Sequence, residues 1–273
     1  MDKNSDFKIL SVDLECTQCK KAESQNKSIP VRRIIEKLDS HFATNDLKSA
    51  QDLLEYWQKE AKTLRDLSGE LSVVNEMLGL YRRTNNKGAA LTSINRALEL
   101  ICYQSLENTI SGATIILNAA TTCKAVGDLE RAASLYEKAS AVYHRELKSD
   151  DLRLAALYNN YATTLTDLER FSEAEELYSK AVLLTGAKVE GLLDCAVSYV
   201  NLAHLFEKSE GLESEKIEKC LANAENVLND SRIERNPYYA FVCEKCAPSF
   251  DYFGFFFFAN ELNERSKKIY EGT

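Results

Sequence analysis

The segment YNNYATTLTDLERFSEAEELYSKAVLL, residues 158–184, decides the fold. Its first half spaces four residues as one face of an α-helix, at i, i+3, i+4 and i+7: Tyr158, Tyr161, Ala162 and Leu165. After the short turn LERF, a second helical face follows: Ala174, Tyr178, Ala181 and Val182. The segment therefore predicts two helices joined by a tight turn, with alanines where the helices cross closely.

The same pattern recurs along the chain, in residues 117–142 and 199–228. A small residue late in each unit gives the period, with steps of 42, 42 and 43 residues: Ala97, Ala139, Ala181 and Ala224. A fixed period of this size is typical of helical repeat arrays. Because neither helix of a unit can bury its apolar face alone, the units must stack to form a core.

The spacing extends to the less regular units at both ends. Residues 34–62 and 76–100 contain the pattern in degenerate form. In the last unit, Asn236 and Pro237 predict an N-cap and first helical residue, while Pro248 should kink or divide the helix that they begin. In the unit of residues 158–184, we expect the first helix to extend back to a cap at Ser149 or Asp150.

Two CxxC pairs raise the question of a metal or redox site. In the register of the repeat, Cys243 and Cys246 fall on the core face of a helix. Cys16 and Cys19 lie more than two hundred residues upstream, unlike the compact spacing of zinc ribbons. We therefore predict no metal site and no cofactor. Core packing is favoured for most of the other cysteines, which fall within or beside predicted helices: Cys102, Cys123, Cys195 and Cys220.

Composition narrows the class of protein. The 273 residues include only 10 Gly and 3 Pro, which favours long helices over many short strands. A net charge of -8 disfavours nucleic acid as a partner, and no segment approaches the roughly 20 apolar residues that span a membrane. The first residues do not resemble a signal peptide, and eight cysteines without one indicate reduced thiols, so we expect a cytoplasmic protein.

Catalytic motifs are not found. The three histidines, His41, His144 and His204, fall in three different units and belong to no partnered motif. Acid-rich runs such as SEAEEL are typical of solvated helix faces. We therefore predict that the protein is not an enzyme.

The repeat units resemble the tetratricopeptide repeat. The residues that carry the resemblance are a small residue in the first helix and an alanine, aromatic, alanine series in the second: Ala162, Phe171, Ala174, Tyr178 and Ala181, with Ala120, Gly127, Ala132, Tyr136 and Ala139 before them. Repeats of about 42 residues are similar to those of kinesin light chain and of bacterial peptide-sensing regulators. The resemblance implies an all-α, right-handed solenoid of about six stacked antiparallel helix pairs over residues 29–273, whose first helices line a concave groove.

Asparagines recur in the first helices at steps of 42 and 41 residues: Asn118, Asn160 and Asn201. Asparagine costs about half a kcal/mol against alanine inside a helix, so a shared reason is expected. An amide can both donate and accept, and the resemblance implies that these residues grip the backbone of an extended peptide. The predicted peptide-binding set adds Thr121, Thr163 and His204, and possible charged contacts are Arg83, Lys124 and Lys208. The alternative is that the amides bond to neighbouring helices and fix the repeat spacing.

The favoured function is therefore a protein–protein interaction scaffold that binds a peptide or protein segment in its groove. One alternative is a peptide-sensing regulator without a DNA-binding domain of its own. Another is self-association as a homodimer through the aromatic last unit, which includes Phe255 to Phe258. Residues 1–28 form a separate arm in which Leu10, Val12, Leu14 and Cys16 alternate as in a strand, and the arm is either disordered or an extended segment that occupies the groove.

Overall fold

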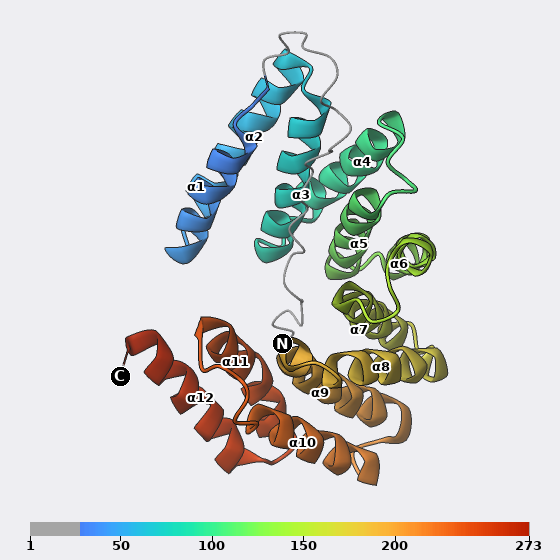
Figure 1. Cartoon of the computed structure of the whole chain (residues 1–273), viewed down its shortest axis with the longest axis vertical. Helices are drawn as coiled ribbons and strands as arrows, with labels where there is room; N and C mark the ends of the chain where they lie inside the picture. The colour runs from blue at the N-terminus through green and yellow to red at the C-terminus, as the bar shows by residue number, and fades with distance from the viewer. Residues whose placement is uncertain (1–27, 273) are drawn as a thin grey trace. The chain divides into compact units, whose positions relative to one another are not determined.

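The computed structural model describes residues 28–272, and this part of the chain is almost entirely helical, with no strand. It contains twelve α-helices and one 3₁₀ turn, and Figure 1 shows the order of the helices. Their bounds are α1 (Val31–Ala43), α2 (Leu47–Leu64), α3 (Leu67–Arg83), α4 (Lys87–Tyr103), α5 (Ile110–Ala125), α6 (Leu129–Glu146), α7 (Leu152–Asp167), α8 (Phe171–Gly186), η1 (Val189–Gly191), α9 (Leu192–Glu210), α10 (Glu215–Leu228), α11 (Pro237–Tyr252) and α12 (Phe256–Glu271). The predicted arm lies outside the described residues, apart from Ser28.

Successive helices form hairpins, each made of a first helix (an A helix, odd-numbered) and a second helix (a B helix, even-numbered). The turn inside each hairpin contains one residue with positive φ, between 50° and 92°: Asn45, Asn85, Gly127, Glu169, Gly211 and Gly254. These residues are 40 to 43 positions apart, as the repeat predicts. A single residue with positive φ follows the A helix, and the chain turns back onto it within three residues, or four between α9 and α10.

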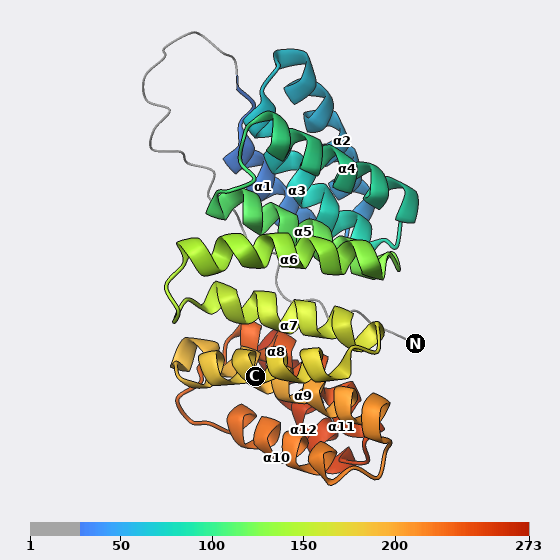
Figure 2. The same ribbon diagram turned by 90° about the vertical axis from the view of Figure 1, so that its right-hand side faces the viewer.

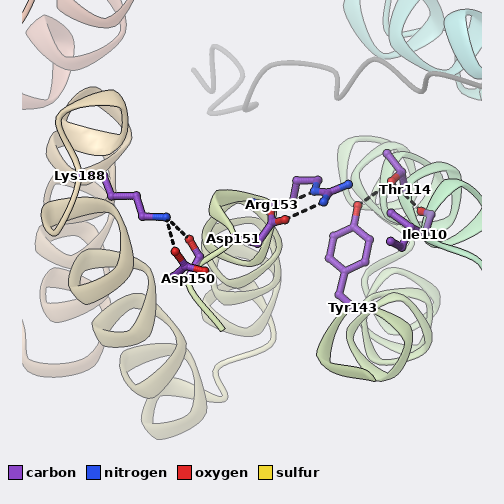
Figure 3. Close-up of polar contacts among 7 residues, drawn as sticks. All are labelled: Ile110, Thr114, Tyr143, Asp150, Asp151, Arg153 and Lys188. Carbon is purple, nitrogen blue, oxygen red and sulfur yellow. Dashed lines mark hydrogen bonds and ion pairs between the residues drawn. The ribbon is translucent and has the colours of Figure 1, made fainter. Parts of the chain in front are cut away.

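The described helices fall into two compact units, one ending at Leu147 and one beginning at Lys148. In the N-terminal unit (residues 28–147), α3 lies against α2, α4 and α5, and its apolar residues are buried almost all round. Leu38, Ala50 and Leu54, which the degenerate pattern places in the core, are fully buried. Hydrogen bonds add to the packing, because the hydroxyls of Thr114 on α5 and Tyr143 on α6 lie 2.7 Å apart (Figure 3).

In the C-terminal unit (residues 148–272), each B helix packs against the A helix of its own hairpin, and α8 also packs against α9 (Figure 2). The alanines that mark the repeat are fully buried at Ala181 and Ala224, as Ala97 and Ala139 are in the other unit. A methyl group at these crossings allows close approach of the two backbones, so an alanine recurs in each hairpin.

Three local predictions are decided by this unit. Asn236 is the N-cap of α11, accepting hydrogen bonds from the backbone N–H groups of Tyr238 and Tyr239, which confirms the predicted start. Pro248 lies inside α11, and the helix runs unbroken from Pro237 to Tyr252, so the prediction that it divides the helix is wrong.

The predicted start of α7 is also wrong. Its cap is Asp151, whose carboxylate accepts from the backbone N–H of Arg153 and also pairs with the guanidinium of that residue. Asp150 instead binds Lys188, whose Nζ lies 2.8 Å from the carboxylate and 2.6 Å from the carbonyl oxygen (Figure 3). A lysine 38 residues away therefore holds the carboxylate that the sequence assigned to the helix end.

The CxxC pair of α11 belongs to the core, as predicted. Cys243 and Cys246 are buried, and burial raises the pKa of the Cys246 thiol to about 12. Cys123, Cys195 and Cys220 are also buried, whereas Cys102 near the end of α4 is exposed. Cys16 and Cys19 lie outside the described residues.

Candidate peptide-binding face

The A helices of the C-terminal unit, α7, α9 and α11, are joined by a row of polar side-chain contacts. Two contacts join α7 to α9, and three join α9 to α11: Asn159 to Asn201, Asp167 to Lys208, Asp194 to Tyr238, Ser249 to His204, and Tyr252 to Glu207. We call the surface that these residues form the A-helix face. It is the part of the unit in which polar side chains from three successive hairpins meet.

Two of the three predicted asparagines pair with another asparagine. Nδ2 of Asn118 donates to Oδ1 of Asn75 over 2.8 Å in the N-terminal unit, and Nδ2 of Asn201 donates to Oδ1 of Asn159 over 3.1 Å in the C-terminal unit. Each pair links an A helix to the A helix of the preceding hairpin, and all four side chains are buried. Asn118 and Asn201 therefore have the geometry expected if their amides bond to neighbouring helices and fix the spacing of the repeats.

Asn160 differs from these two asparagines. Within residues 28–272, its side-chain amide makes no hydrogen bond, although its carbonyl oxygen accepts from the hydroxyls of Thr163 and Thr164. The residue is largely buried, at 6% exposure. Nδ2 of the adjacent Asn159 is also buried without a hydrogen-bond partner in the described chain. Two adjacent amides thus lie in the middle of α7, and one of them has a buried N–H group without a partner in the described chain.

His204 lies at the centre of the α9 to α11 contacts. Its Nε2 is 2.9 Å from Oγ of Ser249, and its Nδ1 is 3.3 Å from Oε2 of Glu207. The hydroxyl of Tyr252 donates to the other oxygen of Glu207, and this hydrogen bond raises the pKa of Tyr252. The ring of His204 lies 4.9 Å from that of Phe253, between centroids.

The predicted charged contacts lie in different surroundings. Nζ of Lys208 pairs with Asp167 over 2.7 Å on the A-helix face. In the N-terminal unit, the guanidinium of Arg83 stacks over the ring of Phe42 on α1, and Lys124 is half-buried near the end of α5.

Thr121 does not face outward. Its hydroxyl donates to the carbonyl of Leu117 and lies 2.8 Å from the hydroxyl of Tyr136 on α6, inside its own hairpin. The structure therefore brings together Asn160, Thr163, Asn201, His204 and Lys208 in one unit, and holds Asn118, Thr121, Arg83 and Lys124 in the other.

The hydrogen bonds that link Ser249 to His204 and His204 to Glu207 are arranged like the serine, histidine and carboxylate of a hydrolase. Such a relay needs donors that bind a developing oxyanion beside the nucleophile. Ser249 lies inside α11, where backbone N–H groups are used by the helix, and the residue before it is Pro248, which has no N–H. We therefore assign this arrangement no hydrolytic role.

The described residues offer no cluster of three or more His, Cys, Asp or Glu side chains suited to a metal ion. No helix within residues 28–272 is long and apolar enough to cross a membrane.

Comparison with known proteins identifies the repeat. Residues 112–182 match the family described as tetratricopeptide repeat. Over these residues the chain is similar to tetratricopeptide repeat proteins. It is similar to the crystal structure of BtubC (BKLC) from P. vanneervenii, with a TM-score of 0.63 and 23% identity over 72% of this chain and 79% of that chain. It is also similar to a putative kinesin light chain with TPR-like repeats from Podosopora anserina, with a TM-score of 0.53 and 17% identity over 73% and 94% of the two chains. No curated protein sequence matches it significantly.

These similarities confirm the predicted all-α solenoid class and the resemblance to tetratricopeptide repeats. Repeats of this kind generally mediate protein–protein interaction and are generally not enzymes, so this repeat protein has the fold of an interaction scaffold.

Several residues of the A-helix face were not identified from the sequence. Asn159 and Asn75 are the acceptors of the two amide pairs, and they are 84 positions apart, which is two repeats of 42. That spacing was a usable signal. No sequence signal indicated the partners of His204, because Ser249 is 45 residues away and the spacing of the last unit is irregular.

Proposed function

We propose that this protein is an interaction scaffold that recognises an extended peptide segment along its A-helix face. The observation that carries the proposal is Asn160, a largely buried amide in the middle of an A helix that has no hydrogen-bond partner in residues 28–272. Buried polar groups are nearly always satisfied by protein, water or ligand. A peptide backbone supplies both the donor and the acceptor that an amide requires.

The neighbouring residues support the same function. Thr163 and His204 are half-buried, so each keeps some accessible surface beside Asn160 and Asn201. Asn118 and Asn201 have a different part in the proposal, because their amides position adjacent A helices. Free cysteines, most of them buried, fit the cytoplasmic location that the composition predicts.

The test is selection from a displayed library of random 12-residue peptides on the full chain. We expect peptides enriched on the wild type to bind Asn160→Ala about fivefold more weakly, the effect of about one lost hydrogen bond. Asn263→Ala, at an exposed position of α12, is the matched control and should bind as the wild type does. If no peptide is enriched, or if Asn160→Ala binds equally well, the proposal fails.

Self-association is a second candidate, which the exposed aromatics of α12 favour. Phe257 is 95% exposed and Phe256 is 58% exposed, at the start of the last helix. Exposed aromatic pairs of this kind are enriched at interfaces. Sedimentation equilibrium at two concentrations tests the idea: we expect a concentration-dependent mass that Phe257→Lys abolishes, and a constant monomer mass for the wild type would exclude it.

A further inference from the structure

The charge of the chain is distributed unevenly. Residues 148–273 contain 22 Asp and Glu against 14 Lys and Arg, whereas residues 1–147 contain 20 of each. The entire net charge of -8 therefore belongs to the sequence of the C-terminal unit. A field of one sign attracts partners of the opposite sign and speeds their association.

Within this unit, three rings gather on the A-helix face. His204, Tyr252 and Phe253 lie with centroid separations of 4.9 Å, 5.0 Å and 6.0 Å, and the ring of Tyr252 stands at 75° to that of Phe253. The residues are accessible, since Tyr252 is 57% exposed and the His204 side chain 36% exposed. The accessible face of a ring such as that of Tyr252 can attract a cation.

The carboxylate of Glu207 lies beside these rings. One of its oxygens accepts from the hydroxyl of Tyr252, and the other is 3.3 Å from Nδ1 of His204. A carboxylate has about four acceptor positions, so it can accept further hydrogen bonds from a ligand. Donation by the phenol to an anion also makes the Tyr252 ring richer in electrons, which strengthens its attraction for a cation.

The nearby basic group does not cancel this charge. Lys208 pairs with Asp167 over 2.7 Å, so this lysine is bound to another carboxylate, while His204 and Tyr252 are the groups that contact Glu207. The exposed Asp251 lies next to Tyr252 in α11 and adds a further negative charge.

We infer that the site formed by His204, Tyr252, Phe253 and Glu207 binds a lysine or arginine side chain, and that the partner is a basic peptide segment. The inference rests on the proposed function, because the same A-helix face binds the backbone of the peptide. Three rings beside a carboxylate favour a cation over an acidic side chain, which Glu207 would repel, and over an aliphatic one, which would leave the carboxylate without a partner.

The experiment is the same random-peptide selection, scored for composition and followed by affinity measurements on variants. Peptides enriched on the wild type are expected to be rich in Lys and Arg. Their affinity should fall about threefold to fivefold in Tyr252→Ala and in Glu207→Gln, and less in Tyr252→Phe, which keeps the ring. Tyr103→Ala, at an exposed position of α4, controls for a lost exposed aromatic, and Glu264→Gln, on the exposed part of α12, controls for a lost negative charge.

The outcomes separate the two ideas. If enriched peptides are not basic, or if Tyr252→Ala and Glu207→Gln bind as the wild type does, the cation site is overturned while a loss in Asn160→Ala still supports the peptide scaffold. If Glu264→Gln weakens binding as much as Glu207→Gln, diffuse charge explains the affinity and the site is again overturned. If no peptide is enriched at all, both proposals fail together. Thermal melts of each variant show that the fold is retained.

Discussion

At the scale of single residues, the backbone of each hairpin turn sets strict requirements. Six residues with positive φ end the A helices, and glycine occupies three of the six positions: Gly127, Gly211 and Gly254. Glycine reaches this region without the steric cost that a Cβ imposes, whereas Asn45 and Asn85 tolerate it better than most other residues. Local sequence is therefore sufficient to position five of the six turns, whereas Glu169, with φ 60°, carries no such signal.

Gly127 provides a direct test of this requirement. An added Cβ would meet no neighbouring atom, so the cost of Gly127→Ala is that of the backbone conformation at φ 88°. We expect a loss of about 1 kcal/mol in the free energy of unfolding, measured by urea denaturation.

The matched control is Gly88→Ala in the first turn of α4, where a Cβ also meets nothing but the residue is helical. There the substitution should stabilise the protein by up to about 1 kcal/mol, because alanine is the better helix former. Equal effects of the same sign at both glycines would contradict the interpretation of the turns.

The cysteines allow a second prediction at this scale. Burial raises the pKa of the thiols of Cys123 and Cys220 to about 11 and that of Cys246 to about 12. Iodoacetamide at pH 8, followed by peptide mapping, should label the exposed Cys102 and leave these three unmodified until the protein is unfolded. The hydrogen bond to Glu107 raises the pKa of Cys102 as well, so its labelling should be slow and should quicken as pH rises. Labelling of Cys246 in the native protein would show that the CxxC pair is accessible.

At the scale of elements, amide pairs join the A helix of one hairpin to the A helix of the next. The same arrangement links α3 to α5 and α7 to α9. Each pair places a directional hydrogen bond between two helices that also make apolar contacts, which tolerate sliding. An amide pair holds one register, because misalignment leaves buried polar atoms without partners.

This interpretation predicts unequal effects for the three asparagines. Asn118→Ala should lower the free energy of unfolding by about 1–3 kcal/mol, since Oδ1 of the buried Asn75 loses its donor. Asn160→Ala should cost less, because the amide it removes has no hydrogen-bond partner within residues 28–272.

A double-mutant cycle with Asn75→Ala should show coupling to Asn118→Ala and none to Asn160→Ala. Equal losses for Asn118→Ala and Asn160→Ala would argue that the amide pairs contribute no specific stability.

At the scale of the whole molecule, helices pack mainly against their neighbours in sequence. In the C-terminal unit, α12 packs chiefly against α11, while α7 packs against α8 and α9. The stability of such an array is approximately a sum of terms for each hairpin and its neighbours. A defect in one hairpin should therefore stay local.

Leu262, fully buried in α12, allows this to be tested. Leu262→Ala removes buried apolar volume, and a loss of about 2–5 kcal/mol is typical of such sites. Hydrogen exchange should show lost protection in α11 and α12, with α7 and α8 unchanged. A uniform loss over all six helices would indicate that the unit unfolds as one cooperative block.

The sequence alone determined the class of fold, the period and the core face of the hairpins. These follow from local rules: the 3.6-residue period of apolar side chains, the small residues at helix crossings, and the residues that tolerate positive φ. They placed Cys243 and Cys246 in the core and Asn236 at a helix start, as the structure confirms.

Tertiary structure alone decided which side chains meet between hairpins. Asn201 pairs with Asn159, Thr121 bonds within its own hairpin, and His204 meets Ser249 and Tyr252 from the next A helix. The repeat period indicates which positions are equivalent. It does not indicate how far each helix is rotated about its own axis relative to the neighbouring helix. A rotation of one residue, about 100°, moves a side chain from the A-helix face to the hairpin interior, so the packing of the helices determined the candidate site.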